Sequence, residues 1–207
     1  PACLDMDLLG KHLNALARGE EIHLPRYNFV TRVQSGPIGR PMRLGKDEVA
    51  VCEGIHALND DIAAYCPDAF RLYISARSIV VDSDGREVFK GTWMRLLRRL
   101  VRDSNFRGTP AAATLDMWAN VRRGEKRFIS PFKERANLMF DSSFPCEVSI
   151  LKNYAAPLLA AVPEGAERYA EIRSILPALE RFETIDPALL APESMLREFI
   201  GGGVYSY

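Results

Sequence analysis

The sequence contains 207 residues, a length that suits one large domain or one domain with an appendage. Hydrophobic residues make up 47% of it and charged residues 26%, as in globular proteins with a substantial core, and no apolar run approaches the ~20 residues that a membrane-spanning helix needs. Lysine plus arginine and aspartate plus glutamate both number 27, so the net charge is zero. This balance argues against a membrane surface or a nucleic acid as partner, and it leaves local clusters as the places where an anion would bind.

The cysteines and histidines are scattered along the chain. Four cysteines, at positions 3, 52, 66 and 146, form no Cys-x-x-Cys pair, and the three histidines are equally dispersed. This spacing argues against a zinc site or a disulfide framework. It favours reduced, structural thiols in a cytoplasmic protein.

The chain begins with a predicted helix that is followed by extended structure. Leucines recur at helical spacing within residues 1–18, and Gly19 is a suitable end for that helix. Ile22–Val30 alternates apolar and polar residues around Pro25, which is typical of a strand at the edge of a sheet. Arg32–Gly45 is rich in glycine, proline and arginine and is predicted to be a loop or a hairpin.

Two aromatic residues of the extended segment lie on one side of it. Tyr27 and Phe29 are two residues apart, so their side chains point the same way along a strand. Such a pair either packs into the core or stacks against a nucleobase. From the residues alone, both interpretations remain open.

The stretch Glu48–Asn59 is the centre of the prediction. Val49–Cys52 is an uninterrupted apolar run, which predicts a strand covered on both faces, as in a parallel sheet between helix layers. The run ends on Glu53, and ligands of open α/β sheets bind beyond the carboxyl ends of the strands. Glu53 is therefore a candidate to hold Mg²⁺ or to polarise a water, with an ordinary surface glutamate as the alternative.

The remaining elements alternate between short strands and helices. An Asp84-Gly85 pair predicts the turn of a hairpin within Ser78–Phe89. The last two long amphipathic helices predict an αα-hairpin packed on the sheet. The other predicted elements are helices over Ile55–Tyr65, Trp93–Asp103, Ala111–Ile129, Glu147–Val162, Ala166–Phe182 and Ser194–Ile200, with strands over Phe70–Ser75 and Leu138–Phe140.

One predicted helix carries a stripe of arginines. Arg95, Arg98, Arg99 and Arg102 are spaced i, i+3, i+4 and i+7, so they share one face, and an apolar stripe occupies another. Like charges in one row repel one another. Either a bound anion neutralises them, for which the planar guanidinium suits phosphate, or acidic neighbours such as Asp103 do so. Both interpretations remain open.

Four segments in matching order resemble the uridine kinase/phosphoribulokinase branch of the P-loop kinases. They are Pro25–Phe29, Glu53–Asn59, Arg95–Asp103 together with Arg107-Gly108, and Leu196–Gly202. The resemblance covers nearly the whole chain. Within that branch it points to bacterial uridine-kinase-like proteins that carry a threonyl-tRNA-synthetase-like (TGS) region before the kinase domain.

The resemblance implies an α/β fold with a three-layer, P-loop nucleotide-kinase-like parallel sheet and C-terminal helices packed on it. It implies phosphoryl transfer from ATP, with Mg²⁺, to a nucleoside-type hydroxyl. This reaction depends mainly on positioning and on neutralising the charge of the transferring group. The implied partners are ATP and a nucleoside-type small molecule, and homo-oligomers are expected if strand edges are left unpaired.

The resemblance also implies roles for individual residues. Glu53 matches the acid near Mg²⁺ and is assigned to catalysis together with Arg98 and Arg102. The helix and loop at about residues 93–130 match the lid that closes over the phosphates. The assigned phosphate-binding residues are Arg95, Arg98, Arg99, Arg102 and Arg107. The assigned substrate-binding residues are Tyr27, Phe29, Arg32 and His56.

The sequence departs from the family pattern at the phosphate-binding loop. The motif Gly-x-x-x-x-Gly-Lys-Ser/Thr does not occur in the 207 residues, and Trp93 and Asn137 stand where aspartates are expected. Residues 1–207 are accordingly interpreted as the C-terminal portion of a single kinase domain without its N-terminal strand and P-loop. The isolated chain is expected to be inactive.

Three functions remain open. The first is a nucleoside kinase, and its alternative is a non-catalytic nucleoside- or phosphate-binding or regulatory module. The third is an RNA-binding module built on the arginine stripe, against which the zero net charge argues. The sequence does not decide the phosphoryl acceptor, the origin of the missing P-loop, the oligomeric state or the regulation.

Overall fold

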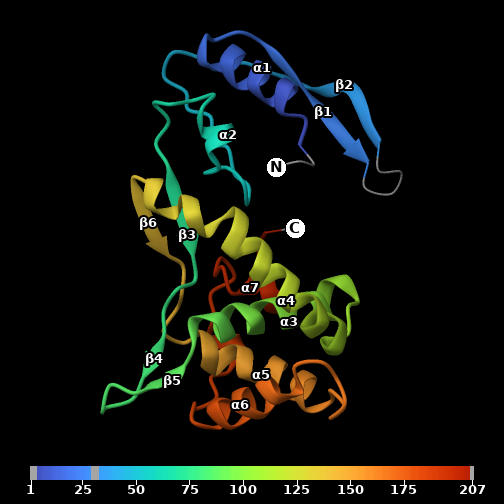
Figure 1. The fold of residues 1–207 in the computed structure, drawn as a ribbon, viewed down its shortest axis with the longest axis vertical. Coiled ribbons are helices and arrows are strands. Elements are labelled where there is room, and N and C mark those ends of the chain that lie inside the picture. The colour runs from blue at the N-terminus through green and yellow to red at the C-terminus, as the bar shows by residue number, and fades with distance from the viewer. Residues whose placement is uncertain (1–3, 29–32, 206–207) are drawn as a thin grey trace. The chain divides into compact units, whose positions relative to one another are not determined.

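The structure is a computed structural model that describes residues 4–28 and 33–205. It is a mixed α/β fold that divides into two compact units. The first, called the N-terminal unit, comprises residues 1–73 and 125–138. The second, called the helical unit, comprises residues 74–124 and 139–207. Figure 1 labels the elements of both units.

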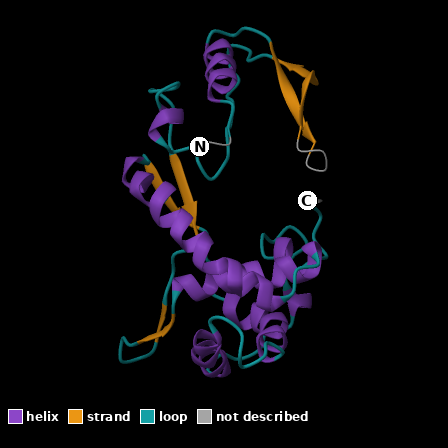
Figure 2. Cartoon of the chain, turned by 45° about the vertical axis from the view of Figure 1, so that its right-hand side comes forward, coloured by secondary structure: helices purple, strands orange, loops and turns teal. Residues whose placement is uncertain are grey.

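The secondary structure consists of short strands and of helices that differ widely in length (Figure 2). The strands are β1 (Ile22–Asn28), β2 (Val33–Met42), β3 (Leu72–Ser75), β4 (Val80–Val81), β5 (Glu87–Phe89) and β6 (Leu138–Asp141). The helices are α1 (Met6–Ala17), α2 (Asp60–Ala63), α3 (Gly91–Arg107), α4 (Ala111–Phe128), α5 (Glu147–Ala160), α6 (Tyr169–Glu180) and α7 (Arg197–Ile200), with 3₁₀ turns η1 (Ser130–Arg135) and η2 (Pro187–Leu189).

The N-terminal unit opens with the short amphipathic helix α1. The helix begins where the side chain of Asp5 accepts a 3.0 Å hydrogen bond from the Leu8 N–H, a common N-cap. The chain leaves the helix at Gly19, whose φ of 70° lies in the left-handed region that favours glycine. Both ends therefore follow from local chemistry, and the predicted helix is confirmed over Met6–Ala17.

An antiparallel hairpin of β1 and β2 follows this helix. Its pairing runs from Ile22 opposite Met42 to residue 28 opposite residue 33. The register shifts around Pro25, whose ring nitrogen has no hydrogen to donate. The hairpin confirms the predicted extended structure up to residue 28. Phe29 and Arg32, both assigned to substrate binding, lie outside the described residues.

The central strand predicted for Val49–Cys52 is not formed. These residues are irregular and exposed, with 85% of Val49 and 89% of Val51 accessible. A strand needs neighbours for its backbone N–H and C=O groups, and among the residues that the structure describes no strand pairs with this segment. Glu53 and Cys52 therefore lie in an exposed loop and not in or at the end of a buried strand.

The helix predicted over Ile55–Tyr65 is much shorter in the structure. Residues 55–58 form turns, and the helix is limited to α2. It begins at Asn59, whose side chain accepts a 3.0 Å hydrogen bond from the Asp61 N–H.

A pair of parallel strands, β3 and β6, joins segments that are far apart in the sequence. The Arg71 carbonyl accepts a hydrogen bond from the Asn137 N–H at 2.8 Å, and the Ser75 carbonyl accepts one from the Ser142 N–H at 3.2 Å. From the first bond to the second the residue numbers rise on both strands, so the two strands run parallel. The strands predicted over these two segments are confirmed.

The predicted three-layer sheet is not assembled in the part of the chain that the structure describes. The sheets there are three, each with two strands: β1–β2, β3–β6 and β4–β5. The β4–β5 pair is the predicted hairpin, and its turn is closed by Asp82, whose Oδ1 accepts hydrogen bonds from the N–H groups of Asp84 and Arg86 at 3.1 and 2.9 Å. The parallel sheet is therefore represented by β3 and β6.

The hydrophobic core lies in the helical unit, on the apolar side of α3. Leu96, Leu97, Leu100 and Val101 are buried there with residues of α4, α5 and α6. The αα-hairpin of α5 and α6 is confirmed, but α5 packs against α3 instead of a sheet, and α6 packs against α5 (Figure 1). Within residues 4–28 and 33–205, no helix is long and apolar enough to cross a membrane.

Candidate functional site

The arginine row of α3 is the strongest candidate site in the helical unit. All five predicted phosphate-binding residues lie on this helix: Arg95, Arg98, Arg99, Arg102 and Arg107. Their side chains are not simply solvated, because each one has interactions with neighbouring groups. We define these five residues as the arginine row.

Arg98 is anchored in the interior by a buried carboxylate. Its Nε and Nη2 both donate to the carboxylate of Glu147 on α5, with Nη2 at 2.6 Å from Oε2, and Nη2 also donates to the Ser142 carbonyl at 2.7 Å. The side chain of Glu147 is 0% exposed and that of Arg98 is 14% exposed. These contacts indicate that Arg98 positions α3 against α5 and the end of β6, whereas its direct contact with phosphate stays a prediction.

Asp103 pairs with two further arginines of the row. Its buried carboxylate lies 3.2 Å from Arg99 Nε and 3.0 Å from Arg107 Nη1. It also accepts a 3.3 Å hydrogen bond from the hydroxyl of Thr114 on α4. The interpretation that acidic neighbours such as Asp103 neutralise the row is thus confirmed for these two residues.

Arg102 meets the C-terminal helix α7. Its Nη1 donates to Oε1 of Glu198 at 3.1 Å, and these side chains are 29% and 30% exposed. The ring of Phe199 lies beneath the guanidinium groups of Arg98 and Arg102, with its centroid 5.2 and 6.0 Å from their Cζ atoms. Arg102 is therefore held by one partly exposed ion pair and one aromatic ring.

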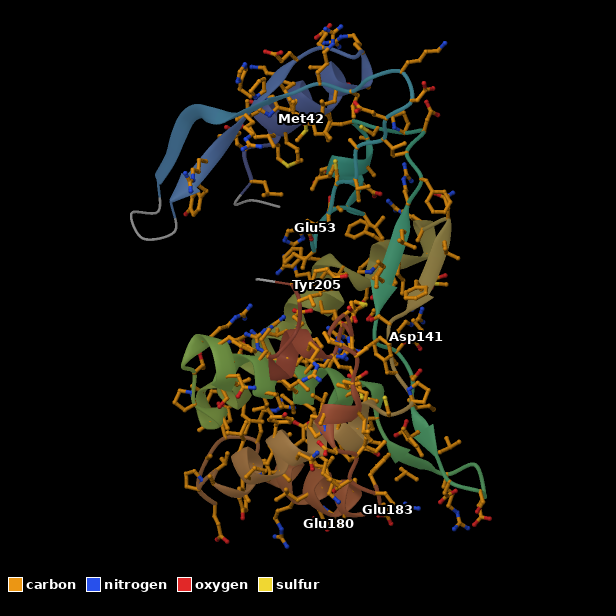
Figure 3. The ribbon with its side chains drawn as sticks, turned by 180° about the vertical axis from the view of Figure 1, so that it is seen from behind. Met42, Glu53, Asp141, Glu180, Glu183 and Tyr205 are labelled. Carbon is orange, nitrogen blue, oxygen red and sulfur yellow. The ribbon has the colours of Figure 1, made fainter. Side chains whose placement is uncertain are left out.

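Asp141, at the carboxyl end of β6, is a residue that the sequence reasoning missed. Its Oδ1 accepts hydrogen bonds from the Arg77 N–H at 3.0 Å and from the Ser143 hydroxyl at 2.7 Å, and its Oδ2 accepts one from the Ser78 hydroxyl at 2.8 Å. Figure 3 labels it. A signal was available, because the predicted strand Leu138–Phe140 ends one residue before this aspartate and carboxyl ends of parallel strands are where ligands bind.

The ionisation of Asp141 is controlled by these contacts. Partial desolvation raises the pKa of its carboxyl group, but the hydrogen bonds from Ser143, Arg77 and Ser78 lower it by more, to well below the usual range. The carboxylate is therefore charged at neutral pH and ties the segment after β3 to the segment after β6.

The other predicted site residues lie in the N-terminal unit. Glu53 is exposed on its loop (Figure 3), and Tyr27 on β1 is about half exposed. His56 has a buried Nδ1 without a hydrogen-bond partner among the described residues, and its ring stands edge-on to Phe128 at 6.5 Å. Burial lowers the pKa of His56, so its imidazole is neutral at physiological pH.

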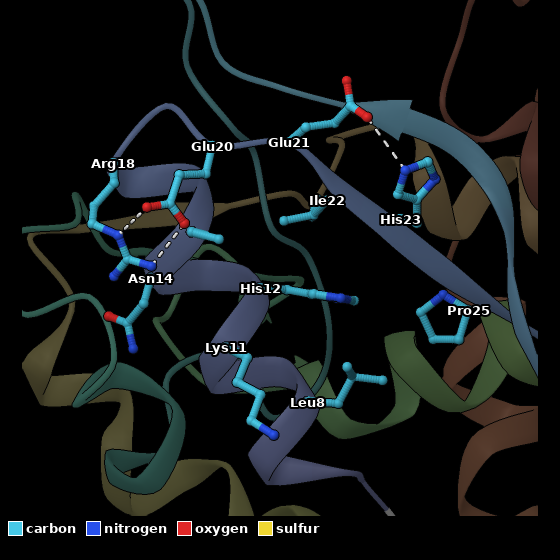
Figure 4. A pocket seen from close by; sticks show the side chains of 11 residues that line it. Leu8, Lys11, His12, Asn14, Arg18, Glu20, Glu21, Ile22, His23 and Pro25 are labelled. Atoms are coloured by element: carbon cyan, nitrogen blue, oxygen red, sulfur yellow. Dashed lines mark hydrogen bonds and ion pairs between the residues drawn. The ribbon is translucent and has the colours of Figure 1, made fainter.

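The N-terminal unit also contains a groove between α1 and β1, with a volume of about 730 Å³. Leu8, Ile22 and Pro25 supply apolar walls (Figure 4). Ion pairs between neighbouring residues occupy much of its polar lining, including Arg18 with Glu20 at 2.7 Å. Among the described residues that were assigned from the sequence, none lines this groove.

Comparison with known proteins identifies the family. The model of the phosphoribulokinase / uridine kinase family matches residues 1–148. The chain belongs to this family. Uridine kinases of Bacillus pumilus and Staphylococcus haemolyticus are 28% and 27% identical to it over 151 residues, which are 72% of this chain and 63% and 64% of those relatives. The uridine kinase of Halobacterium salinarum is 29% identical over 140 residues, 67% of this chain and 54% of that protein.

The extent of these matches matters for the site. The chain spans less than two thirds of the length of these curated relatives of the phosphoribulokinase/uridine kinase family. The family match contains the whole arginine row with Asp103 and Glu147, but it ends before α7. Glu198 and Phe199 therefore contact the arginine row from outside the matched residues.

The described residues of this family member contain few clustered side chains that could be ligands of Mg²⁺. No group of three or more histidine, cysteine, aspartate or glutamate side chains there could hold a metal ion. Kinases commonly bind Mg²⁺ through one or two carboxylates together with substrate phosphates, so a single carboxylate such as Glu53 is chemically suitable. Glu53 alone is not a preformed metal site.

Proposed function

We propose that the complete gene product containing this chain transfers a phosphoryl group from ATP to a nucleoside-type hydroxyl, as a uridine-kinase-like enzyme. The observation that carries the proposal is the arginine row on α3 in a chain of the phosphoribulokinase/uridine kinase family. Phosphoryl transfer is catalysed mainly by positioning and by neutralising charge on the transferring group. A row of arginines is suited to the second task.

We further propose that residues 1–207 are the C-terminal portion of one kinase domain of the three-layer P-loop type, with a lid at about residues 93–130. The exposed apolar side chains of β3 and β6, among them Ile74 and Phe140, support this proposal. Strands of a parallel sheet are normally covered on both faces, so such a pair has the character of part of a larger sheet. An accompanying TGS-like region stays a prediction.

The arginines are proposed to divide the work. Contact with phosphate groups is proposed for the other four arginines of the row. The side chains of Arg99, Arg102 and Arg107 are more exposed than that of Arg98, and Arg95 lies on the same face of α3. Arg98 would fix the direction of the helix through its buried pair. The nucleoside is proposed to be recognised by Tyr27, Phe29, Arg32 and His56.

Glu53 is proposed to lie near the metal. Mg²⁺ bound together with ATP would supply positive charge at the phosphates. In the complete gene product, we expect Glu53→Gln to lower kcat at least tenfold, which corresponds to about 1.4 kcal/mol of transition-state stabilisation. Because Glu53 is exposed, the melting temperature should not change. Wild-type kcat at saturating Mg²⁺ and ATP, equal to that of a Glu183→Gln control, would exclude this role.

A second candidate function is a non-catalytic nucleoside- or phosphate-binding regulatory module. It is favoured by the internal carboxylates of Asp103, Glu147 and Glu198, which already neutralise arginines of the row without any anion. An assay of the complete gene product with [γ-³²P]ATP and a panel of nucleosides separates the two. Labelled nucleoside monophosphate supports the kinase, and saturable nucleotide binding with no transfer to any nucleoside supports the module.

A further inference from the structure

The C-terminal segment 196–203 covers part of the arginine row. Leu196 and Phe199 are buried in the core of the helical unit, and the Phe199 carbonyl accepts a 3.0 Å hydrogen bond from the side-chain amide of Asn105 on α3. This docking carries Glu198 onto Arg102. The segment lies beyond residue 148, where the family match ends.

The path of this segment is specified by its own residues. Gly201 and Gly202 have φ values of 87° and 71°, a backbone region that glycine enters without strain. The guanidinium of Arg197 donates to the carbonyls of Pro187 and Leu190 at 3.0 and 2.7 Å. Specific hydrogen bonds and glycine conformations therefore fix the segment on the helical unit, and Glu198 reaches α3 through a defined turn.

Two interhelical ion pairs of α3 differ in how exposed they are and in how many hydrogen bonds they contain. The pair of Arg98 with Glu147 is buried and has two hydrogen bonds, so its opening would leave a buried carboxylate with the Phe144 N–H as a donor and no counterion. The pair of Arg102 with Glu198 has one hydrogen bond and is partly exposed, and pairs of this kind are weak. In addition, the buried Nε of Arg102 has no hydrogen-bond partner among the described residues.

We propose that Glu198 is an internal counterion that occupies Arg102 in the absence of ligand and is displaced by polyphosphate groups. The C-terminal segment thereby sets the affinity of the arginine row for phosphate, an inference that rests on the phosphate-binding role proposed above. A polyphosphate carries more charge than one carboxylate, and its oxygens can accept two parallel hydrogen bonds from a guanidinium. Phe199 remains beneath Arg102 and keeps it in place when Glu198 leaves.

The test uses the 207-residue chain and inorganic tripolyphosphate as the probe, by isothermal titration calorimetry at low ionic strength. Glu198→Gln keeps the shape of the side chain and removes its charge, so we expect binding about two- to tenfold tighter than wild type. Glu180→Gln, at the exposed end of α6 (Figure 3), removes the same charge without a contact to Arg102 and should leave the affinity unchanged. Added salt should reduce the difference in affinity between Glu198→Gln and wild type.

The double variant Arg102→Gln/Glu198→Gln should not show the tighter tripolyphosphate binding of Glu198→Gln, because it lacks the guanidinium that the loss of the Glu198 charge would release. Equal affinities of wild type and Glu198→Gln would overturn the counterion role and leave the arginine row as a phosphate site. Absence of binding in every variant would overturn the phosphate role of the row as well. The melting temperatures of wild type and Glu198→Gln should match, since Leu196 and Phe199 still anchor the segment. Glu198→Ala is a second variant that should bind tripolyphosphate more tightly than wild type.

Discussion

In α3 the apolar stripe is buried and four arginines have acidic partners, whereas in the segment Val49–Asn59 the apolar residues Val49 and Val51 remain exposed. Both regions have strong patterns in the sequence. A helix satisfies its backbone hydrogen bonds internally, so a periodic pattern is enough to form it and to select its buried face. A strand depends on a neighbour for the same bonds. The difference teaches that an apolar run specifies burial only when a partner segment is present.

The largest effect is expected from opening the buried pair of α3. Arg98→Ala would leave the carboxylate of Glu147 buried with only the Phe144 N–H as a donor, so the free energy of unfolding should fall by about 3–5 kcal/mol. Urea titration of the 207-residue chain measures it. Arg102→Ala on the same helix is the matched control and should cost roughly 1 kcal/mol or less. Equal losses in the two variants would show that burial does not distinguish the pairs.

A second prediction compares the two regions directly. Leu97→Ala removes a fully buried side chain of α3 and should lower the free energy of unfolding by about 2–5 kcal/mol. Val51→Ala removes an exposed side chain and should change it by roughly 0.5 kcal/mol or less. Both are read from urea titrations of the 207-residue chain. A loss for Val51→Ala as large as that for Leu97→Ala would show that the segment is packed as a strand.

The smallest effect is expected at Asp141 and depends on pH. The pKa of its carboxyl group is lowered in the folded chain, so its hydrogen bonds contribute stability above the unfolded pKa, and this contribution is lost as pH falls below about 4 towards the folded pKa. The melting temperature of Asp141→Asn should therefore lie below that of wild type at pH 6 and approach it on acidification. Glu180→Gln is the control. Parallel curves of melting temperature against pH for wild type and Asp141→Asn would contradict a stabilising role of the charged Asp141 carboxylate.

Much of the helical unit could be predicted from the sequence. The arginine and leucine stripes of α3, the two helices α5 and α6, the Asp84-Gly85 turn and the β3 and β6 segments were identified from periodicity and turn residues. The same periodicity identified four of the candidate arginines, whereas Arg107 and the phosphate-binding role were implied by the family resemblance. Their partners did not, except for Asp103, because Glu147 and Glu198 are 49 and 96 residues away from the arginines that they contact.

The sequence by itself determined most of the local elements: the positions of the long helices, which face of α3 is apolar, and which residues line up in a row. The tertiary structure alone decided that Arg98 pairs with a buried carboxylate, that Arg102 pairs with a partly exposed one, and that Asp141 is held by the residues after β3. It also decided that Val49–Cys52 is exposed. The reason is physical: periodicity encodes bonds within a few residues, whereas burial and charge pairing depend on segments that only folding brings together.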